Sequence, residues 1–261
     1  MRKIICFDMD MTLLDHKDYR IPDSAMDALA QLRQKGHIIA IASGRDMDNE
    51  FSKPLADLVK PDAIVHSNGQ KVTVGNKIIR QLFMEPDLIR RLLEFAEPRG
   101  ICIGFNIGEQ GCYLHKEKVI AREKELFGSC DREFIDPSNL LCAPLYALAM
   151  FGTPQEAALI EEAFPMLKLP LFAAREGADV IYRDASKAEG IKALLEYYGM
   201  SREDVVAFGD SMNDLEMIRF AGTGVAMGNA IPALKEEADF VTKPIDQDGV
   251  LYGLRKLGVL D

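Results

Sequence analysis

The sequence predicts an α/β fold in which a doubly wound parallel sheet is interrupted by an inserted α+β domain. Short segments that are apolar on both faces alternate with amphipathic segments in the first and last thirds of the chain, whereas the middle third has a different pattern. Strand–helix alternation is typical of a right-handed parallel sheet with helices on both faces. The length of 261 residues suffices for two modest domains.

The first part of the chain supplies three predicted strands, each a short apolar run of the kind found inside parallel sheets. They are residues 3–7, 37–42 and 63–65. Residues 24–35 are predicted to form a helix, because apolar side chains recur on one side. Ser24 and Asp27 match a capping box, and Gly36 is expected to end the helix.

The last part of the chain resumes the same alternation. Its predicted helices are residues 187–198, 214–221 and 235–238, and its predicted strands are residues 205–208, 224–227 and 240–242. Because both parts share one pattern, we expect residues 1–83 and 184–261 to build a single sheet.

The middle of the chain combines two helical segments with strands that glycines separate. Helices are predicted at residues 87–97 and 154–164, and strands at residues 102–107, 112–115 and 146–151. Residues 116–125 mix both charges, which indicates a solvated helix or loop. We therefore expect residues 84–183 to form a separate α+β domain inserted into the core.

The composition argues against several classes of partner. A net charge of −10 without a basic patch predicts no binding of nucleic acid or of anionic lipid. The longest mostly apolar stretch, residues 140–152, is too short to span a membrane, and the apolar start ends at Asp8, too early for a signal peptide. The five cysteines form no CxxC pair, which favours reduced thiols and a cytoplasmic location.

Polar residues that directly follow the buried strands are the candidate functional residues, because ligands bind at the carboxyl ends of strands in such sheets. Asp8 and Asp10 follow the first strand. Two neighbouring carboxylates repel each other, so a cation such as Mg²⁺ with oxygen ligands is expected beside them. A carboxylate can also attack phosphorus as a nucleophile. Turn or helix-capping aspartates are the structural alternative.

Three further segments extend this pattern. Ser43-Gly44-Arg45 follows the second strand and suits a phosphate group, although a simple helix N-cap by Ser43 explains it as well. Lys187 begins a predicted helix and is either a surface lysine or a cation for phosphate and carboxylates. Gly209-Asp210-Ser211-Met212-Asn213-Asp214 adds oxygen ligands that favour Mg²⁺, with an Asx-turn as the alternative.

In order, spacing and context these segments resemble the motifs of the haloacid dehalogenase-like hydrolases, specifically the Cof-type phosphatases. Asp8-x-Asp10-x-Thr12-Leu13-Leu14 is similar to the first motif, and the other three segments to the second, third and fourth. Residues 66–69 (HSNG) and 224–230 (GVAMGNA) are similar to further signatures of this branch. One residue departs from the pattern, because Met11 stands where the family usually has glycine. A bulky residue there is expected either to restrict the backbone of the turn or to protrude toward the substrate, which would affect catalytic efficiency and not the metal site.

The resemblance implies a Rossmann-like core and an Mg²⁺-dependent phosphatase that hydrolyses small phosphate monoesters. Asp8 would form an aspartyl-phosphate, and Asp10 would act as general acid and then as general base. Asp8, the Asp10 backbone carbonyl and Asp210 would hold the metal. The phosphoryl group would be bound by Met9, Ser43, Gly44, Lys187 and Asn213, and Thr12 and Asp214 would support these groups.

The resemblance also implies that residues 84–183 form a cap that selects the substrate. Asn106, Glu109 and Tyr113 are candidates there, each with a plain packing or surface explanation. The expected substrate is a small phosphorylated metabolite, most often a sugar or polyol phosphate, with a flavin or pyridoxal phosphate next. A phosphomutase, a non-catalytic protein that binds phosphorylated ligands and a hydrolase of carbon–halogen bonds stay open as alternatives. The sequence does not predict an oligomeric state.

Overall fold

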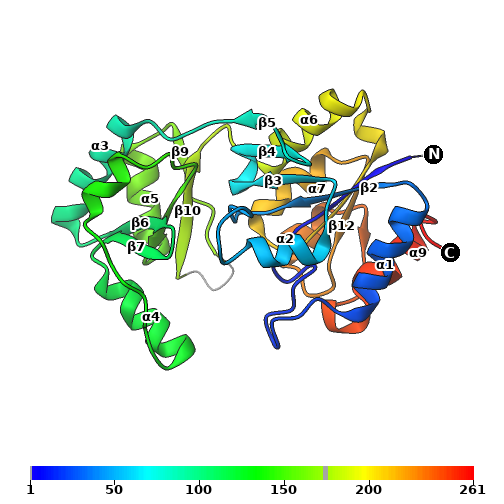
Figure 1. Ribbon diagram of the computed structural model, residues 1–261, viewed down its shortest axis with the longest axis horizontal. Helices are drawn as coiled ribbons and strands as arrows, with labels where there is room; N and C mark the ends of the chain where they lie inside the picture. The colour runs from blue at the N-terminus through cyan, green and yellow to red at the C-terminus, as the bar shows by residue number, and fades with distance from the viewer. Residues whose placement is uncertain (1, 173–175) are drawn as a thin grey trace. The chain divides into compact units, whose positions relative to one another are not determined.

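The structure, a computed structural model, describes residues 2–172 and 176–261 and divides into two compact units (Figure 1). The first unit contains the residues up to Gln81 and from Ala185 onward, and the second contains Leu82–Asp184. The predicted limits of the inserted domain, residues 84 and 183, lie one or two residues inside these limits. Both units carry a sheet with helices, so each is described by itself.

The first unit contains an eight-stranded sheet in the order β13-β12-β11-β1-β2-β3-β4-β5. Its strands are β1 (Ile4–Phe7), β2 (Ile38–Ala42), β3 (Ala63–His66), β4 (Lys71–Val74), β5 (Lys77–Gln81), β11 (Val205–Gly209), β12 (Thr223–Ala226) and β13 (Phe240–Val241). All neighbouring strands from β13 to β3 are parallel, whereas β4 and β5 form an antiparallel hairpin at one edge. The predicted fold class is confirmed, and the hairpin is an addition to it.

Helices cover both faces of this sheet. They are α1 (Asp23–Gln34), α2 (Lys53–Val59), α6 (Lys187–Tyr198), α7 (Leu215–Phe220), α8 (Pro232–Glu237) and α9 (Gly249–Lys256). Helix α1 packs beside α9, and α6 packs beside α7 (Figure 1). The β1–α1–β2 and β11–α7–β12 crossovers run outward in opposite directions from the centre of the sheet, and right-handed connections therefore place α1 and α7 on opposite faces.

The predicted start of α1 was wrong. The helix begins at Asp23 with Pro22 in the capping position, and no side chain caps it. Ser24 therefore lies inside the first turn, and the predicted capping box with Asp27 does not form. The proline sets φ to −54°, which directs the chain into the helix without a side-chain cap. The predicted end is correct, because Gly36 has a positive φ of 77°.

The centre of the sheet carries the core. Every residue of β1, β2 and β11 is buried, as the continuous apolar runs of these strands require. Phe7 of β1 stacks on Phe208 of β11, with ring centroids 5.2 Å apart. The chain leaves β1 toward β2 on one side and returns to β11 on the other, so the sheet reverses its direction of winding at β1. Ligand sites of doubly wound sheets lie at the carboxyl ends of the strands at such a point.

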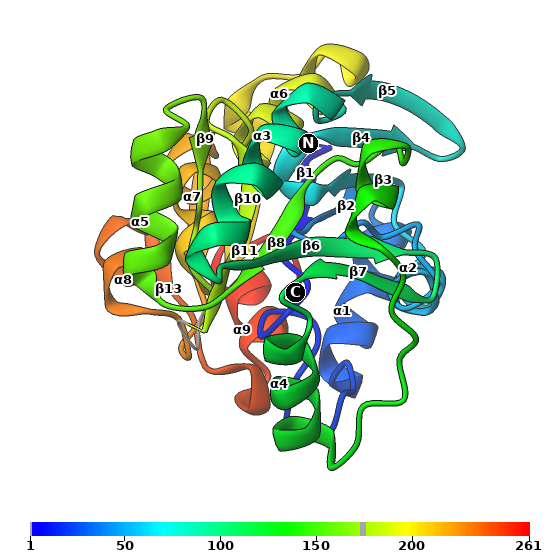
Figure 2. The same cartoon turned by 90° about the vertical axis from the view of Figure 1, so that its left-hand side faces the viewer.

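The second unit is built on an antiparallel sheet in the order β7-β6-β8-β10-β9 (Figure 2). Its strands are β6 (Cys102–Ile107), β7 (Gln110–Leu114), β8 (Leu148–Phe151), β9 (Leu167–Lys168) and β10 (Gly177–Tyr182), and its helices are α3 (Pro86–Ala96), α4 (Glu117–Phe127) and α5 (Pro154–Ala163). The mixed-charge segment predicted as helix or loop is helix α4. Within the described part of the chain, no helix is both long and apolar enough to cross a membrane.

Candidate active site

The strands at the centre of the first unit bring the sequence-predicted residues to one edge of the sheet. Asp8 directly follows β1, Ser43 follows β2, and Asp210 follows β11. The Asp8 backbone N–H donates to the Phe208 carbonyl at 2.9 Å, which continues the ladder one step beyond the strands. Residues far apart in the sequence therefore meet at the carboxyl ends of neighbouring strands, as the parallel arrangement predicts.

A buried cluster of three carboxylates forms the centre of this edge. Oxygen atoms of Asp8, Asp210 and Asp214 all lie within 4.8 Å of one another. Lys187 is completely buried among them, and its Nζ donates to Asp8 Oδ1 at 2.6 Å and to Asp214 Oδ1 at 2.5 Å. One ammonium therefore faces three acidic groups, so the cluster carries an excess of negative charge that a further cation would offset.

Asp214 has a mainly structural arrangement. Its Oδ1 binds Lys187, and its Oδ2 accepts the backbone N–H groups of Asp210 and Ser211 at 2.9 and 3.0 Å. Gly209 makes room for this side chain, since a Cβ at that position would lie 2.6 Å from the Asp214 side chain. Because both of its carboxylate oxygens are engaged, Asp214 holds the Asp210 loop and the lysine in place.

The pKa shifts of the cluster also indicate an excess of negative charge. Burial raises the pKa of Asp8, and repulsion from Asp214 and Asp10 adds to this, while Lys187 opposes it. Burial also raises the pKa of Asp210, and Asp8 and Asp214 add to the effect. Burial lowers the pKa of Lys187, but the two carboxylates in contact with it outweigh this and raise the pKa overall. The ammonium therefore stays charged, and the two aspartates lack a sufficient positive partner.

A divalent cation fits the donor set that remains. Lys187 donates to Asp8 Oδ1 and leaves the other oxygen of Asp8 for a further partner, and the Thr12 hydroxyl donates to Asp210 Oδ1 over a long distance of 3.5 Å. Both side chains are buried, and both offer carboxylate oxygens, the ligands that hard cations prefer. The site can therefore bind a metal ion through Asp8 and Asp210, with Thr12 beside them.

A second acidic group, Asp46, Asp48 and His66, fits a metal poorly. The Lys71 ammonium lies 2.5 Å from Asp48 Oδ2 and 3.5 Å from Asp46 Oδ1. His66 Nδ1 accepts the Met47 backbone N–H at 3.1 Å, so its lone pair is already in use. The lysine thus supplies the positive charge that a metal would bring, and this group ties together the loops that follow β2 and β3.

Asp10 lies beside the cluster, and its carboxylate is bound by Arg45 and His16, which are not members of the cluster. Arg45 donates from Nε to Asp10 Oδ2 at 2.7 Å and from Nη2 to Asp10 Oδ1 at 2.6 Å. His16 Nε2 lies 2.7 Å from the same Oδ1, and the His16 ring stacks on Tyr19. Burial raises the pKa of Asp10, but hydrogen bonds from His16 and Arg45 outweigh it and lower the pKa overall.

The second motif forms a tight turn after β2. Ser43 is buried, and its Oγ accepts the Arg45 backbone N–H at 3.1 Å. The neighbouring loop after β3 is tied to it, because Asn68 N–H donates to the Ser43 carbonyl and Ser67 N–H donates to the Arg45 carbonyl, both at 2.9 Å. The turn with Gly44 is therefore fixed on both sides, which suits a rigid anion site.

The loop after β3 also approaches the start of α6. Gly69 has a φ of 91°, and a Cβ there would lie 2.0 Å from the Ser186 carbonyl oxygen. Only glycine allows this approach, which fixes the loop beside the helix that carries Lys187. Asn213 is connected to the same loop, because its Nδ2 donates to Asn68 Oδ1 at 3.1 Å and its Oδ1 accepts the Ser211 hydroxyl at 2.7 Å.

Met11 adopts the conformation that glycine would favour. Its φ is 59°, in the left-handed region. The turn is closed by a hydrogen bond of 2.8 Å from Met11 N–H to the Leu14 carbonyl. Asn229 Nδ2 donates to the Met11 carbonyl at 2.8 Å. The backbone of the turn is therefore strained at Met11, in line with the expected effect of a bulky residue there. The neighbouring Met9 is fully buried.

The sequence did not predict several contacts at the site, although Asn68 and Asn229 lie in the segments 66–69 and 224–230 that resemble family signatures. Arg45 was predicted only as part of a motif, and no role was assigned to His16, Asn68 or Asn229. Each of these side chains acts through a contact with a residue distant in sequence or across a loop, which spacing alone does not reveal. A cation after β2 that could reach the second aspartate after β1 was the only signal available for Arg45.

The candidate residues in the second unit have plain explanations in the structure. Tyr113 of β7 is buried and packs against Phe151. Asn106 accepts a hydrogen bond from Arg132, and Glu109 is an exposed turn residue. None of the three is singled out by its surroundings.

Comparison with known proteins agrees with this geometry. The sequence matches the haloacid dehalogenase-like hydrolase family over residues 5–254. The chain belongs to this family. It is 37% identical over 262 aligned residues to YkrA of Bacillus subtilis (strain 168), which is named as a phosphatase, covering 99% of this chain and 98% of YkrA. As a member of the haloacid dehalogenase-like hydrolases with phosphatase relatives, the protein is a phosphatase.

Two solved structures are closely similar. BT1666 from Bacteroides thetaiotaomicron, a phosphatase of the superfamily, superposes with a TM-score of 0.91 at 25% identity, covering 100% of this chain and 96% of that one. The subclass IIB sugar phosphatase BT4131 superposes with a TM-score of 0.86 at 27% identity, covering 99% and 100%. The phosphatase relatives imply a phosphorylated small molecule as substrate.

Proposed function

We propose that the protein hydrolyses small phosphate monoesters in the presence of Mg²⁺, through an aspartyl-phosphate on Asp8. The observation that carries this proposal is the buried contact of Asp8 with Lys187 beside Asp210, with Asp10 two residues further on. A nucleophile needs a fixed position and a partner for the charge of the incoming phosphate. The position of Asp8 is fixed because it directly follows β1, and the Lys187 ammonium supplies part of the positive charge that the phosphate needs.

In the proposed reaction, an Asp8 oxygen attacks phosphorus while the bond from phosphorus to the leaving oxygen breaks. Asp10 gives a proton to the leaving alkoxide. In the second step a water attacks the phosphorus of the aspartyl-phosphate and Asp10 takes up the water proton, so that inorganic phosphate leaves and Asp8 is restored. Lys187 balances charge on the phosphoryl oxygens throughout.

The remaining contacts of the phosphoryl group are proposed from the same edge of the sheet. The backbone N–H groups of Met9 and Gly44, the Ser43 hydroxyl and Asn213 would bind its oxygens, and Thr12 and Asp214 would hold the surrounding groups in place. The fixed turn after β2 supports the role of Ser43 and Gly44.

Asp8, Asp210 and the Asp10 carbonyl are the proposed ligands of Mg²⁺. When bound, the ion would supply positive charge that offsets the carboxylates and polarises a phosphoryl oxygen. Oxygen-only donors favour Mg²⁺ over zinc or copper. The excess negative charge of the cluster is the structural support for this assignment.

A sugar phosphate or a similar small metabolite is the proposed substrate. The similarity to the sugar phosphatase BT4131 supports this class, and the net charge of −10 disfavours long polyanions. We further propose that residues 84–183 are the substrate-selecting cap. Exchange of these residues for those of a relative with a different preference should transfer the preference. A preference that stays with residues 1–83 and 184–261 would show that the core selects the substrate.

A phosphomutase is the second candidate, because it uses the same aspartyl-phosphate and returns the phosphoryl group to an acceptor. Addition of a sugar phosphate acceptor would then suppress the release of inorganic phosphate.

The five free cysteines, three of them buried, support a reducing compartment such as the cytoplasm.

The proposed function is tested by assaying the purified protein on a panel of phosphorylated metabolites with Mg²⁺, with Ca²⁺ and with excess chelator. Phosphate release should require Mg²⁺ and should be poorly supported by Ca²⁺, which prefers longer bonds and a higher coordination number. Asp210→Ala should raise the Mg²⁺ concentration needed for half-maximal rate. Full activity in chelator, in both wild type and Asp210→Ala, would remove the metal from the proposal.

A further inference from the structure

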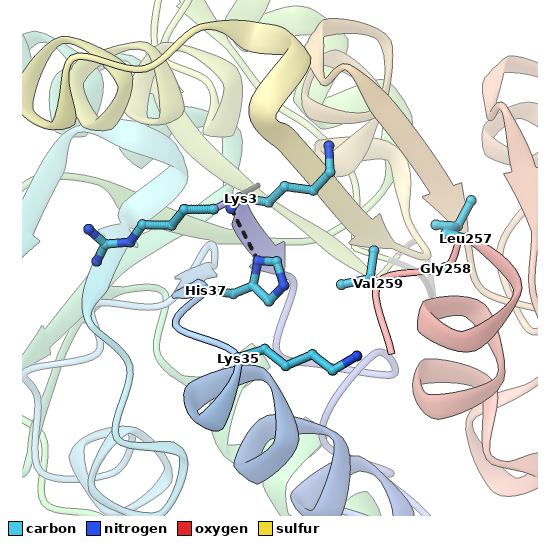
Figure 3. A pocket seen from close by; sticks show the side chains of 7 residues that line it. Lys3, Lys35, His37, Leu257, Gly258 and Val259 are labelled. Atoms are coloured by element: carbon cyan, nitrogen blue, oxygen red, sulfur yellow. Dashed lines mark hydrogen bonds between the residues drawn. The ribbon is translucent and has the colours of Figure 1, made fainter. Parts of the chain in front are cut away.

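A cavity lies in the first unit on the side away from the candidate active site. It has a volume of about 500 Å³ and is lined by Arg2, Lys3, Lys35, His37 and residues 257–259 (Figure 3). Lys3 and His37 directly precede β1 and β2, so the cavity lies at the amino ends of the strands whose carboxyl ends carry the active site. At about 3.3 Å per residue, five residues of extended chain separate Lys3 from Asp8 by roughly 16 Å.

The charge of this cavity is opposite to that of the whole protein. Four of its seven lining residues are basic and none is acidic, although the chain carries a net charge of −10. The basic residues come from two separate segments, the start of the chain and the turn after α1, and the segment after α9 completes the lining with uncharged residues. Cations of like charge at one place repel each other unless an anion lies between them.

Among the described residues, only exposed or backbone groups contact these cations, and the Asp204 carboxylate acts on Lys3 without a direct contact. Lys35 Nζ contacts an Asp261 carboxylate oxygen at 2.9 Å, but the Asp261 side chain is 96% exposed, and such surface pairs contribute little. Lys3 Nζ donates to the Glu203 carbonyl at 3.3 Å. Arg2 makes no hydrogen bond or ion pair with the residues that the structure describes. The Lys35 contact shows that a carboxylate can already reach the rim of the cavity.

His37 presents a hydrogen-bond donor to the same space. Its Nδ1 accepts the Lys3 backbone N–H at 3.1 Å, so in the neutral ring the proton must be on Nε2. Figure 3 shows this second nitrogen pointing between Lys35 and Val259. Burial lowers the pKa of His37, and the positive charges of Lys3 and Lys35 add to the effect. A neutral imidazole with a directed N–H is therefore part of the lining.

We propose that this cavity binds the phosphate group of a small phosphorylated molecule, at a site separate from the active site. Lys3, Lys35 and Arg2 would supply charge, and the His37 Nε2–H would supply a directed donor. The volume lies in the range of small-molecule sites, and the negative charge of the rest of the protein opposes long polyanions. The cavity contains none of the proposed catalytic residues, so binding there does not depend on the proposed function.

Histidine NMR tests this directly, because the protein has only four histidines and each reports on a different place. His37 lies in the cavity, whereas His16 contacts Asp10 and reports on phosphate in the active site. The full-length protein is titrated with inorganic phosphate and with phenylphosphonate, an ester-like probe that is not hydrolysed. The His37 signal, assigned by its loss in His37→Gln, should shift to saturation, and its titration midpoint should rise because a bound anion stabilises the imidazolium.

Matched variants distinguish phosphate binding in the cavity from a nonspecific effect of surface charge. The double variant Lys3→Gln, Lys35→Gln should weaken the His37 response about tenfold or more, since two charge-assisted contacts are lost. Lys53→Gln removes a charge from an exposed pair with Asp57 and should leave the response unchanged. A response to both probes supports the proposal, whereas a response to phosphate but not to phenylphosphonate would contradict it, because the ligand would then be the free ion.

The proposal is overturned if the His37 signal follows ionic strength equally in chloride and phosphate, or if the double variant responds like wild type. It is also overturned if only a long polyanion such as heparin shifts the signal, since that would indicate a macromolecular partner. A shift of His16 alone would place phosphate binding in the active site and exclude the cavity.

Discussion

Arg45 holds Asp10 with two hydrogen bonds, one from Nε to Oδ2 at 2.7 Å and one from Nη2 to Oδ1 at 2.6 Å. This bidentate pair, together with His16, lowers the pKa of Asp10 against the effect of its burial. In this arrangement Asp10 is an ionised carboxylate, ready to accept a proton from water. To donate a proton to a leaving group, it must first gain one at the expense of the Arg45 contact.

This pair predicts which step is most sensitive to Arg45. In Arg45→Gln the Asp10 side chain loses its position, and this loss outweighs the greater basicity that a higher pKa gives it, so hydrolysis of the aspartyl-phosphate should slow by roughly tenfold to a hundredfold. Phosphorylated protein should then accumulate in rapid-quench experiments with an activated aryl phosphate. Arg219→Gln, which breaks an exposed pair with Glu237, is the matched control. Equal turnover of Arg45→Gln and Arg219→Gln would refute a role for the contact.

Replacement of Met11 by glycine should relieve the strain of the backbone at this position, a gain that a comparison with alanine isolates from the lost packing of the methionine side chain against the core. Met11 has a φ of 59°, a conformation that costs a residue with a Cβ about 1 kcal/mol and costs glycine almost nothing. Met11→Ala is the control, because it removes the same side chain but keeps the Cβ. In urea unfolding, the glycine variant should be more stable than the alanine variant by about 1 kcal/mol. An alanine variant that equals or exceeds the glycine variant would show that this backbone is unstrained.

Removal of the buried ammonium should destabilise the metal-free protein strongly. Lys187→Met leaves Asp8 and Asp214 buried without their shared partner, and loss of one member of such a group costs about 3–5 kcal/mol. Lys192→Met, on the exposed face of the same helix, should change the free energy of unfolding by less than about 0.5 kcal/mol. Comparable effects of the two substitutions would mean that the carboxylates are not charged.

The stability of the protein should fall as the pH drops below about 6.5, in part because of His37. Its pKa is lower in the folded state than the ordinary value of 6.5, so the unfolded chain binds a proton first as the pH falls. This term is absent above about pH 6.5 and grows below it. His37→Gln should therefore reduce the loss of unfolding free energy between pH 7 and pH 5.5, measured in phosphate-free buffer. An unchanged slope would contradict the lowered pKa.

Much of the fold could be predicted because buried parallel strands carry continuous apolar runs. β1, β2 and β11 were visible for this reason, and the polar residues that follow them could be placed at one edge by topology alone. The β4–β5 hairpin was not predicted, because β5 is largely exposed and lacks such a run. The start of α1 was misplaced because Ser24 imitates a cap that Pro22 makes unnecessary.

The motifs predicted which residues belong to the site but not the contacts between their side chains. The positions after strands and at the start of a helix indicated the candidates Asp8, Lys187 and Asp214. Their direct contacts depend on side-chain geometry that no spacing encodes. The pairing of Asp10 with Arg45 and His16 depends on how the loop after β1 folds back, and on a turn that Met11 enters with a positive φ.

The proposed mechanism is tested most directly by trapping the phosphorylated enzyme and locating the phosphoryl group. Asp10→Asn protein is mixed with an activated aryl phosphate and Mg²⁺, quenched in acid and digested, and the peptides are analysed by mass spectrometry. The phosphoryl group is expected on Asp8, and it should be absent when Asp8→Asn is added to the same variant. A phosphoryl group on any other residue, or phosphate release by Asp8→Asn at the wild-type rate, would contradict the proposed mechanism.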